Sequence, residues 1–221
     1  MARAMVDQNG IRRTPVSKPA IEFIFDFASP NAYLVLKVLP AIAQRHGAEI
    51  KLIPCLLGGI FKATGNQAPF NAFAGIKGKL EYDRLEMQRF AVRHELTAFR
   101  MNPHFPINTL ALMRGMVAAQ HLSAAETYVS AVLTGMWEHG EKMDDPEIAL
   151  AILNRSGLDG ARLLELSTSP EVKAELVANT EAAAARGVFG IPTFFVGEEM
   201  FFGKERLGQI EELLSTLSSG A

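Results

Sequence analysis

β-strand patterns occur only at the two ends of this chain, and the long stretch between them shows helical patterns alone. At the first end, the β-branched and aromatic run Ile21 to Phe27 predicts a mostly buried strand. A helix is predicted from Ser29-Pro30 to about His46, and a second strand over 49–57. At the other end, 190–203 predicts an aromatic hairpin, followed by a helix at about 204–217. Neither end can be stable alone, so the two are expected to complete one sheet.

The middle of the chain predicts a block of helices separated by turn and capping signals. Their expected spans are 78–95, 107–120, 123–138, 145–155, 159–166 and 170–186. The fold class is therefore α/β, a four-stranded sheet with helices on both faces and a large all-helical insertion. We expect residues 20–57 and 186–221 to form the sheet domain, 58–185 the insertion, and 1–19 a flexible arm.

Composition excludes several function classes. Lys and Arg number 22 against 24 Asp and Glu, so the chain has no basic surplus for nucleic acid. A single cysteine, Cys55, excludes a disulfide within the chain and favours a reducing, cytoplasmic location. The first twenty residues lack the apolar run of a secretory signal, and no window approaches the roughly 20 apolar residues of a membrane span.

Ser29 is the strongest local signal for chemistry. A strand ends and a helix begins here, with serine at the capping position and Pro30 at the first helical position. The free N–H groups of such a helix start favour an anion. Taken alone, Ser29 is better explained as a plain helix cap. Neither G-x-S-x-G nor S-x-x-K surrounds it, so a serine hydrolase is not indicated.

A second signal is Gly190-Ile191-Pro192-Thr193, which leads into the hairpin. Proline is tolerated at the first residue of a strand, and an apolar residue before it makes the Ile191–Pro192 bond a candidate for the cis form.

Together the two signals resemble the thioredoxin fold, and the long insertion resembles its DsbA-like branch. Redox members have Cys-Pro-x-Cys where this chain has Ser29-Pro30-Asn31-Ala32. Four segments resemble the 2-hydroxychromene-2-carboxylate isomerase family, which is related to kappa-class glutathione transferases. They are FDFASPNAYL, GGIFKATGN, NPHFPINTLALMRG and GVFGIPTFFVGEEMFFGKERL. The resemblance runs from about Ile21 to Leu214.

The resemblance implies that glutathione is the cofactor and that Ser29 holds its sulfur. The positive end of the helix can then stabilise only a thiolate from outside the chain. Asn66 is implied to hold the peptide backbone, and Lys79 to pair with a glutathione carboxylate. Lys77 is an alternative to Lys79. The acidic residue of the same region matches Glu86.

The other end of glutathione is implied to lie along the hairpin. The backbone of Ile191, before the cis candidate Pro192, would pair with the cysteinyl part. Lys204 and Glu205 would bind the γ-glutamyl end. Glu205 keeps the negative charge that suits an amine, whereas Lys204 departs from the small polar residue of relatives.

A small aromatic substrate is implied to lie over the sulfur, in an apolar pocket. The expected lining residues are Phe61, Tyr82, Asn102, His104, Phe105, Phe201 and Phe202. Phe201 and Phe202 stand where characterised isomerases of this type carry tryptophans. Each phenylalanine could instead pack in the core, and the Asn102–His104 segment could be a surface loop. No histidine or cysteine spacing indicates a metal.

Three functions stay open. The first is a glutathione-dependent isomerase of aromatic ring-fission products, in which the bound thiolate adds to a conjugated carbon and is later eliminated. The second is a kappa-like glutathione transferase. The third is a non-catalytic thioredoxin-fold binding module. Because Cys55 lies on a predicted strand, a thiol–disulfide oxidoreductase is disfavoured. The resemblance also implies a homodimer.

Overall fold

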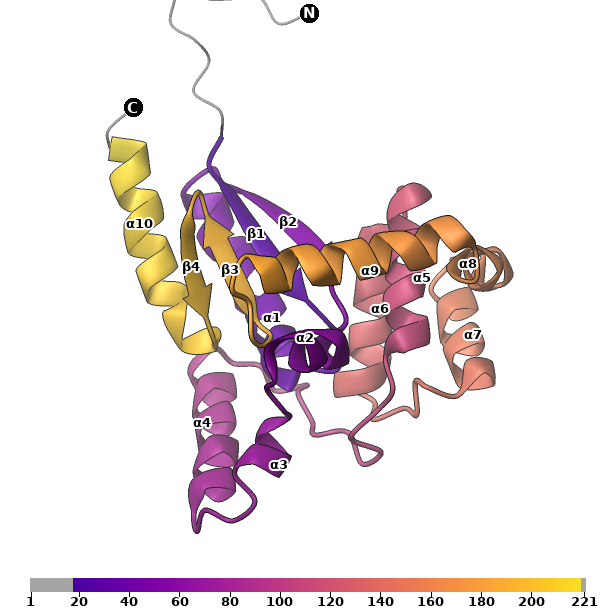
Figure 1. Cartoon of the computed structure of the whole chain (residues 1–221), viewed down its shortest axis with the longest axis horizontal. Helices are drawn as coiled ribbons and strands as arrows, with labels where there is room; N and C mark the ends of the chain where they lie inside the picture. Colours follow the sequence, from indigo (N-terminus) through magenta and orange to yellow (C-terminus); the bar gives the residue numbers. More distant parts are fainter. Residues whose placement is uncertain (1–17, 220–221) are drawn as a thin grey trace, which may run out of the picture.

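The two ends of the chain form one sheet, as the sequence predicts. A computed structural model describes residues 18–219. Most of the predicted arm at 1–19 therefore lies outside the described residues. The strands are β1 (Ala20–Phe25), β2 (Glu49–Pro54), β3 (Thr193–Val196) and β4 (Glu199–Phe202), in the order β2-β1-β3-β4 (Figure 1). β1 is parallel to β2 and antiparallel to β3, so the sheet is mixed.

The central strand β1 carries the densest part of the core. Phe23 is fully buried and pairs in register with Leu52 of β2 on one side and Phe194 of β3 on the other. The rings of Phe23 and Phe194 lie 4.8 Å apart. Burying each ring contributes roughly 1.5–3 kcal/mol, so this row holds the early and late segments together. β3 and β4 are joined through Gly197, whose φ of 61° suits a tight hairpin turn.

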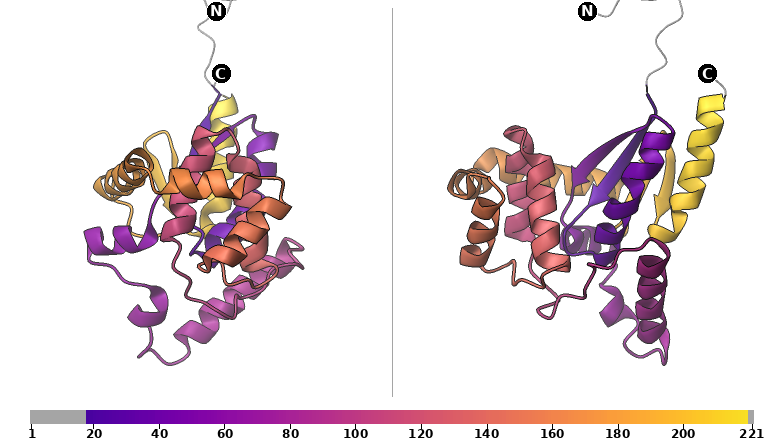
Figure 2. Two further views of the ribbon diagram at one scale, coloured as in Figure 1. Left: turned by 90° about the vertical axis from the view of Figure 1, so that its right-hand side faces the viewer. Right: turned by 180° about the vertical axis from the view of Figure 1, so that it is seen from behind.

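Helices cover both faces of the sheet. α1 (Pro30–Arg45) lies behind the strands in Figure 1 and in front of them in the rear view of Figure 2, with α10 (Leu207–Ser219) beside it. α9 (Pro170–Ala185) crosses the opposite face and contacts β2. The last helix of the predicted insertion therefore also serves as a layer of the sheet. The division into a sheet domain and an insertion stays a prediction.

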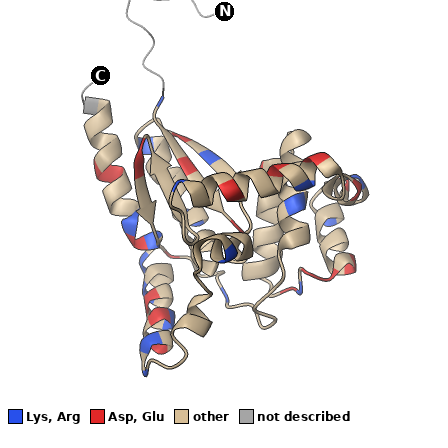
Figure 3. Ribbon diagram, viewed as in Figure 1, with Lys and Arg blue, Asp and Glu red and all other residues tan. Residues whose placement is uncertain are grey.

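The remaining helices lie between β2 and α9 in sequence. They are α2 (Leu57–Thr64), α3 (Pro69–Ala72), α4 (Lys79–Arg93), α5 (Leu110–His121), α6 (Ala125–Trp137), α7 (Pro146–Arg155) and α8 (Gly160–Ser167). The last four pack on one another, and α5 also contacts α9. α4 extends away from this body and has no buried residue (Figure 1). Residues of both charge signs alternate along it (Figure 3).

Capping side chains confirm four of the predicted helix starts, at Ser29, Asp145, Asp159 and Ser169. Asp145 and Ser169 each accept a hydrogen bond from the first turn that they cap, and proline follows each of them. Among the helices of residues 18–219, none combines the length and apolar character that a bilayer crossing requires.

Three sequence predictions need correction. The second strand ends at Pro54 rather than 57, because Leu57 already begins α2, and neither α2 nor α3 was predicted. The helix expected from 107 begins at Leu110, since the loop after Pro106 continues to Thr109. The helix expected from 204 begins with a 3-10 turn, η1 (Lys204–Arg206), before α10.

Candidate active site

Ser29 lies where β1 gives way to α1, and its hydroxyl joins two distant parts of the chain. As the cap of α1, its Oγ accepts from the Ala32 N–H at 3.2 Å. The same hydroxyl donates to the Ile191 carbonyl at 3.1 Å. Ser29 is only 5% exposed. The structure therefore brings together the two segments that the sequence marked out separately.

The Ile191–Pro192 bond is cis, as predicted. Both residues are buried, and the Pro192 carbonyl accepts from the Gly203 N–H at 2.9 Å. This bond ties the approach to β3 to the start of η1, so Lys204 and Glu205 follow directly. η1 in turn contacts α1.

Asn66 is exposed, at the turn after α2, and its amide donates to the Phe189 carbonyl at 2.7 Å. Gly65 ends α2 in the left-handed conformation, with φ of 69°, which turns the chain toward Asn66. The Gly65-Asn66 turn and the segment that leads to Ile191 are therefore held side by side.

Lys204, Glu205 and Glu86 form a charged cluster between η1 and α4. Lys204 is 5% exposed, forms an ion pair with Glu205, and places its ammonium 5.8 Å from the centre of the Phe90 ring. A hydrogen bond from Arg89 holds the pKa of Glu86 below its usual range, with smaller contributions from the Tyr82 hydroxyl and the charge of Lys204. Tyr82 is more than half exposed beside it.

Lys79 and Lys77 are not part of this cluster. Lys79 begins α4, forms an ion pair with Asp83 one turn later, and lies over the Phe73 ring at 5.0 Å. Lys77 is exposed in the preceding loop. The choice between the two lysines stays a prediction.

Asn102 and His104 belong to one loop but lie in different surroundings. Asn102 is buried, and its amide donates to the Met136 and Glu141 carbonyls at 2.7 and 2.8 Å. Its Oδ1 accepts from the His104 N–H at 2.8 Å. Because both polar atoms of the side chain are engaged within the protein, Asn102 braces its own loop rather than presenting its amide to a ligand. The His104 side chain is exposed.

The four phenylalanines expected to line the pocket lie in different surroundings. Phe61 on α2 is half-buried. Phe105 is half-buried against Phe70 and Trp137, with ring distances of 5.7 and 6.0 Å. Neighbouring residues of a strand point to opposite faces, so Phe201 and Phe202 cannot form one wall. Whether either of them lines a substrate pocket stays a prediction.

Of the two, Phe202 lies beside the segment that leads to Ile191. Its ring is 4.6 Å from that of Phe189, and a Cβ on Gly190 would come within 2.9 Å of it. Phe201, in contrast, packs against the hydrophobic core.

Sequence reasoning missed two polar residues near Ser29. Asn31, in the first turn of α1, has a buried Oδ1 without a hydrogen-bond partner among the described residues. Asp26, the residue after β1, is fully buried. Their positions beside Ser29 in the FDFASPN segment were the only available signal, since neither type is unusual before or within a helix start.

Cys55 cannot serve as the nucleophile of this site. It is fully buried, and its Sγ lies 3.4 Å from the Asn179 carbonyl. Burial, and secondarily the nearby Asp26, raises the pKa of the thiol to about 12.

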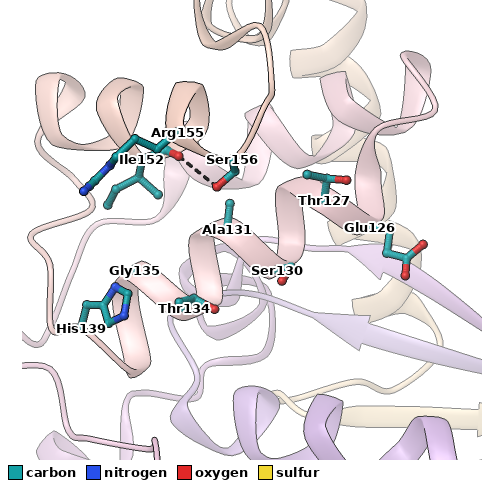
Figure 4. A pocket seen from close by; sticks show the side chains of 10 residues that line it. All are labelled: Glu126, Thr127, Ser130, Ala131, Thr134, Gly135, His139, Ile152, Arg155 and Ser156. Carbon is teal, nitrogen blue, oxygen red and sulfur yellow. Dashed lines mark hydrogen bonds between the residues drawn. The ribbon is translucent and has the colours of Figure 1, made fainter.

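An open pocket of about 540 Å³ lies elsewhere, between α6 and α7 (Figure 4). It is lined partly by hydroxyl side chains and by His139 and Arg155. It shares no residue with the Ser29 site. Within residues 18–219, no group of three His, Cys, Asp or Glu side chains could hold a metal ion.

Comparisons with known proteins agree with this geometry. The family model of the DSBA-like thioredoxin domain matches residues 20–215. The 2-hydroxychromene-2-carboxylate isomerase of Pseudomonas putida is 30% identical over 89% of this chain and 95% of its own length. Human glutathione S-transferase kappa 1 is 27% identical over 88% and 90% of the two chains.

A solved structure of a 2-hydroxychromene-2-carboxylate isomerase superposes with a TM-score of 0.78 at 28% identity, covering 90% of this chain and 95% of that one. The shared architecture thus extends over the sheet and the helices between its halves. The chain belongs to the 2-hydroxychromene-2-carboxylate isomerase family, within the DsbA-like thioredoxin domains.

Proposed function

We propose that the protein is a glutathione-dependent isomerase of the 2-hydroxychromene-2-carboxylate type, acting on small aromatic ring-fission products. One observation supports this most directly. A buried serine hydroxyl, rather than a cysteine, lies at the start of α1 against the Ile191 carbonyl. The one cysteine of the chain is buried and has a high pKa, so a reactive thiolate at this helix end must come from a bound thiol.

The residues at this end suit a thiolate. Free N–H groups and the positive end of α1 lower the pKa of a thiol from its usual value of about 8.5. The Ser29 hydroxyl carries one hydrogen, which it gives to the Ile191 carbonyl. Donating that hydrogen to a sulfur would free this carbonyl to accept a peptide N–H, as pairing with a cysteinyl residue requires.

The same residues fit a tripeptide. Within residues 18–219 the Asn31 Oδ1 finds no donor, and a buried acceptor without one costs about 1–3 kcal/mol. Peptide N–H groups are such donors. When bound, glutathione supplies a thiolate nucleophile, which is the reagent that isomerisation of a conjugated double bond needs. This chain's own residues bind, orient and stabilise it.

The remaining contacts are proposed as follows. Asn66 and the Ile191 backbone hold the peptide, Glu205 takes the γ-glutamyl amine, and Lys204 and Glu86 complete that end. Lys79 or Lys77 pairs with the glycyl carboxylate. The aromatic substrate is proposed to contact Phe61, Tyr82, His104 and Phe202.

A kappa-like glutathione transferase is the second candidate. Human glutathione S-transferase kappa 1 aligns over 88% of this chain at 27% identity, close to the value for the isomerase relatives. Phe202 stands where characterised isomerases of this type carry a tryptophan. This difference favours a substrate other than that of the isomerases. In a transferase the same thiolate would end in a stable conjugate.

We also propose a homodimer that works in the cytoplasm. α4 has no buried residue, yet it exposes Tyr82, Leu85 and Val92, which a second copy could cover. Light scattering would give the mass, and a monomer at micromolar concentration would refute the dimer.

The deciding experiment follows the absorbance of a 2-hydroxychromene-2-carboxylate with and without glutathione. Isomerisation that requires glutathione, with all of it recovered as free thiol, supports the isomerase. A stable conjugate in the mass spectrum supports the transferase. Retention on immobilised glutathione without turnover of either kind would leave the non-catalytic binding module.

A further inference from the structure

Asp26 is a buried carboxylate that the proposed chemistry does not use. It directly follows β1, three residues before Ser29, and is fully buried. A carboxylate removed from water persists only where hydrogen bonds or charges compensate for its lost hydration. Its surroundings therefore indicate what it does.

Three donors surround this carboxylate. Oδ1 accepts from the Ala28 N–H at 2.9 Å and from the Thr109 hydroxyl at 2.7 Å. Oδ2 accepts from the Leu57 N–H at 2.7 Å. All three groups are hydrogen-bond donors. An ionised carboxylate can accept from all of them, because both of its oxygens are acceptors.

Each donor belongs to a different segment of the candidate site. Ala28 directly precedes Ser29. Leu57 begins α2, which ends at the Asn66 turn. Thr109 ends the loop that carries His104 and Phe105. These segments come from separate parts of the sequence, and the carboxylate is a shared partner of all three.

Ser29 is tied to the same point through the backbone. Its N–H donates to the Asp26 carbonyl at 3.2 Å. The intervening Phe27 carbonyl accepts from the Trp137 indole at 3.0 Å. A shift of the Asp26 side chain would therefore move the turn that aims the Ser29 hydroxyl.

We infer that Asp26 is a positioning residue, which fixes the Ser29 hydroxyl relative to the Asn66 turn and the 102–109 loop. The inference rests on the proposed function, because the hydroxyl matters only if a thiolate lies against it. Asp26 acts through Ser29 and does not itself touch the sulfur.

Two substitutions separate positioning from simple bulk. Asp26→Asn keeps the size, and its amide cannot accept at both positions, so at least one of the three donors loses its partner. Thr109→Val removes one hydroxyl donor without changing the shape of the side chain, and Thr109→Ser restores that hydroxyl. Ser167→Ala is the matched control, since it removes a buried hydroxyl on α8 that donates to the Leu164 carbonyl of the same helix.

The experiment uses glutathione itself as the probe on the full chain. Calorimetry gives the binding constant, and ultraviolet absorbance against pH gives the pKa of the bound thiol. We expect Asp26→Asn and Thr109→Val to reduce the bound thiolate at neutral pH by about three- to ten-fold, with the binding constant within about three-fold, because most contacts to the tripeptide lie elsewhere. Thr109→Ser and Ser167→Ala should match wild type.

An unchanged thiol pKa in both Asp26→Asn and Thr109→Val would overturn the inference. So would a Thr109→Ser variant that behaves like Thr109→Val. If Asp26→Asn does not fold, the two Thr109 variants decide. A wild-type protein that does not bind glutathione would instead refute the proposed function, so the two failures are distinguishable.

Discussion

At the scale of single residues, the site depends on where hydrogens and charges are placed. Ser29 provides one hydroxyl, and Asp26 accepts hydrogen bonds from three donors behind it. Asn31 has a buried acceptor that no described residue satisfies. Cys55 is close in space to Asp26 but shielded from solvent. The residue that would carry redox chemistry in a thiol enzyme is therefore absent from the helix start, and the thiol that remains is inert.

Cys55 is expected to be unreactive in the folded protein. Burial raises its pKa to about 12, so at pH 8 only a minute fraction is thiolate, the form that reacts. A chromogenic disulfide reagent should label less than about one tenth of the protein in native buffer and all of it in denaturant. Cys55→Ser should still bind glutathione. Rapid native labelling, or loss of binding in Cys55→Ser, would contradict this.

Asp26 is expected to give the stability a specific pH dependence. Burial raises its pKa above the usual 3.8, against the opposing effect of its hydrogen bonds. A group with a raised folded pKa contributes stability that is complete below the unfolded pKa and is lost as the pH rises through the folded one. As the pH rises from about 4 to 8, wild type should therefore lose unfolding free energy that Asp26→Asn does not lose. The stability of Asp26→Asn relative to wild type should rise over this range.

The measurement is thermal or urea unfolding of both proteins across that range. Cys55, the other group with a raised pKa beside Asp26, titrates above this window. A difference between wild type and Asp26→Asn that does not vary with pH would show that Asp26 has no raised pKa.

At the scale of elements, capping signals were the most reliable guide from sequence to structure. Ser29-Pro30, Asp145-Pro146 and Ser169-Pro170 mark true helix starts, because a cap and a following proline act locally. α2 was missed because Gly58 and Gly59 argue against a helix. The structure gives a reason for Gly59: a Cβ there would lie 2.9 Å from the Thr180 methyl on α9. This glycine serves close helix packing.

Loss of the Ser169 cap should cost stability alone. Its hydroxyl accepts from the Val172 N–H at 3.2 Å, and removing such a cap costs about 0.5–2 kcal/mol. Ser169→Ala should lower the unfolding free energy by that amount and leave glutathione binding unchanged. Ser169→Asp, which can still cap, should retain most of the stability. Equal stability of Ser169→Ala and wild type would contradict the assignment.

At the scale of the whole molecule, sequence reasoning found the sheet and the family but not the contacts across the site. The pattern of strands at both ends predicted one sheet, and the Ser-Pro and Ile-Pro motifs predicted which segments meet. Bonds such as Thr109 to Asp26 or Asn66 to the Phe189 carbonyl join residues far apart in the sequence. No local pattern specifies them. Asn102 illustrates the same limit, since its burial depends on Met136 and Glu141.

The sheet and the helical block should unfold together. The sole tryptophan, Trp137, is fully buried on α6, and its indole donates to the Phe27 carbonyl beside β1. Its fluorescence therefore reports on the junction of the two parts. In urea, fluorescence and far-ultraviolet circular dichroism should change with one midpoint. Two separated transitions would mean that the block and the sheet are independent folding units.

The most direct test of the account is the pKa of the glutathione thiol bound to wild type, Ser29→Ala and Ser169→Ala. Both variants lose a helix cap, and Ser29→Ala also loses the hydrogen bond to the Ile191 carbonyl, so its stability should fall at least as far. Only Ser29 is proposed to meet the sulfur. Losing a hydrogen bond to a charged group costs about 1.5–3 kcal/mol, which is roughly ten- to a hundred-fold in thiolate population.

The account predicts a thiol pKa below about 8.5 in wild type and in Ser169→Ala, and a value about one to two units higher in Ser29→Ala. The turnover rate of Ser29→Ala should fall in parallel. If the thiol pKa were the same in all three proteins, Ser29 would be a helix cap and nothing more.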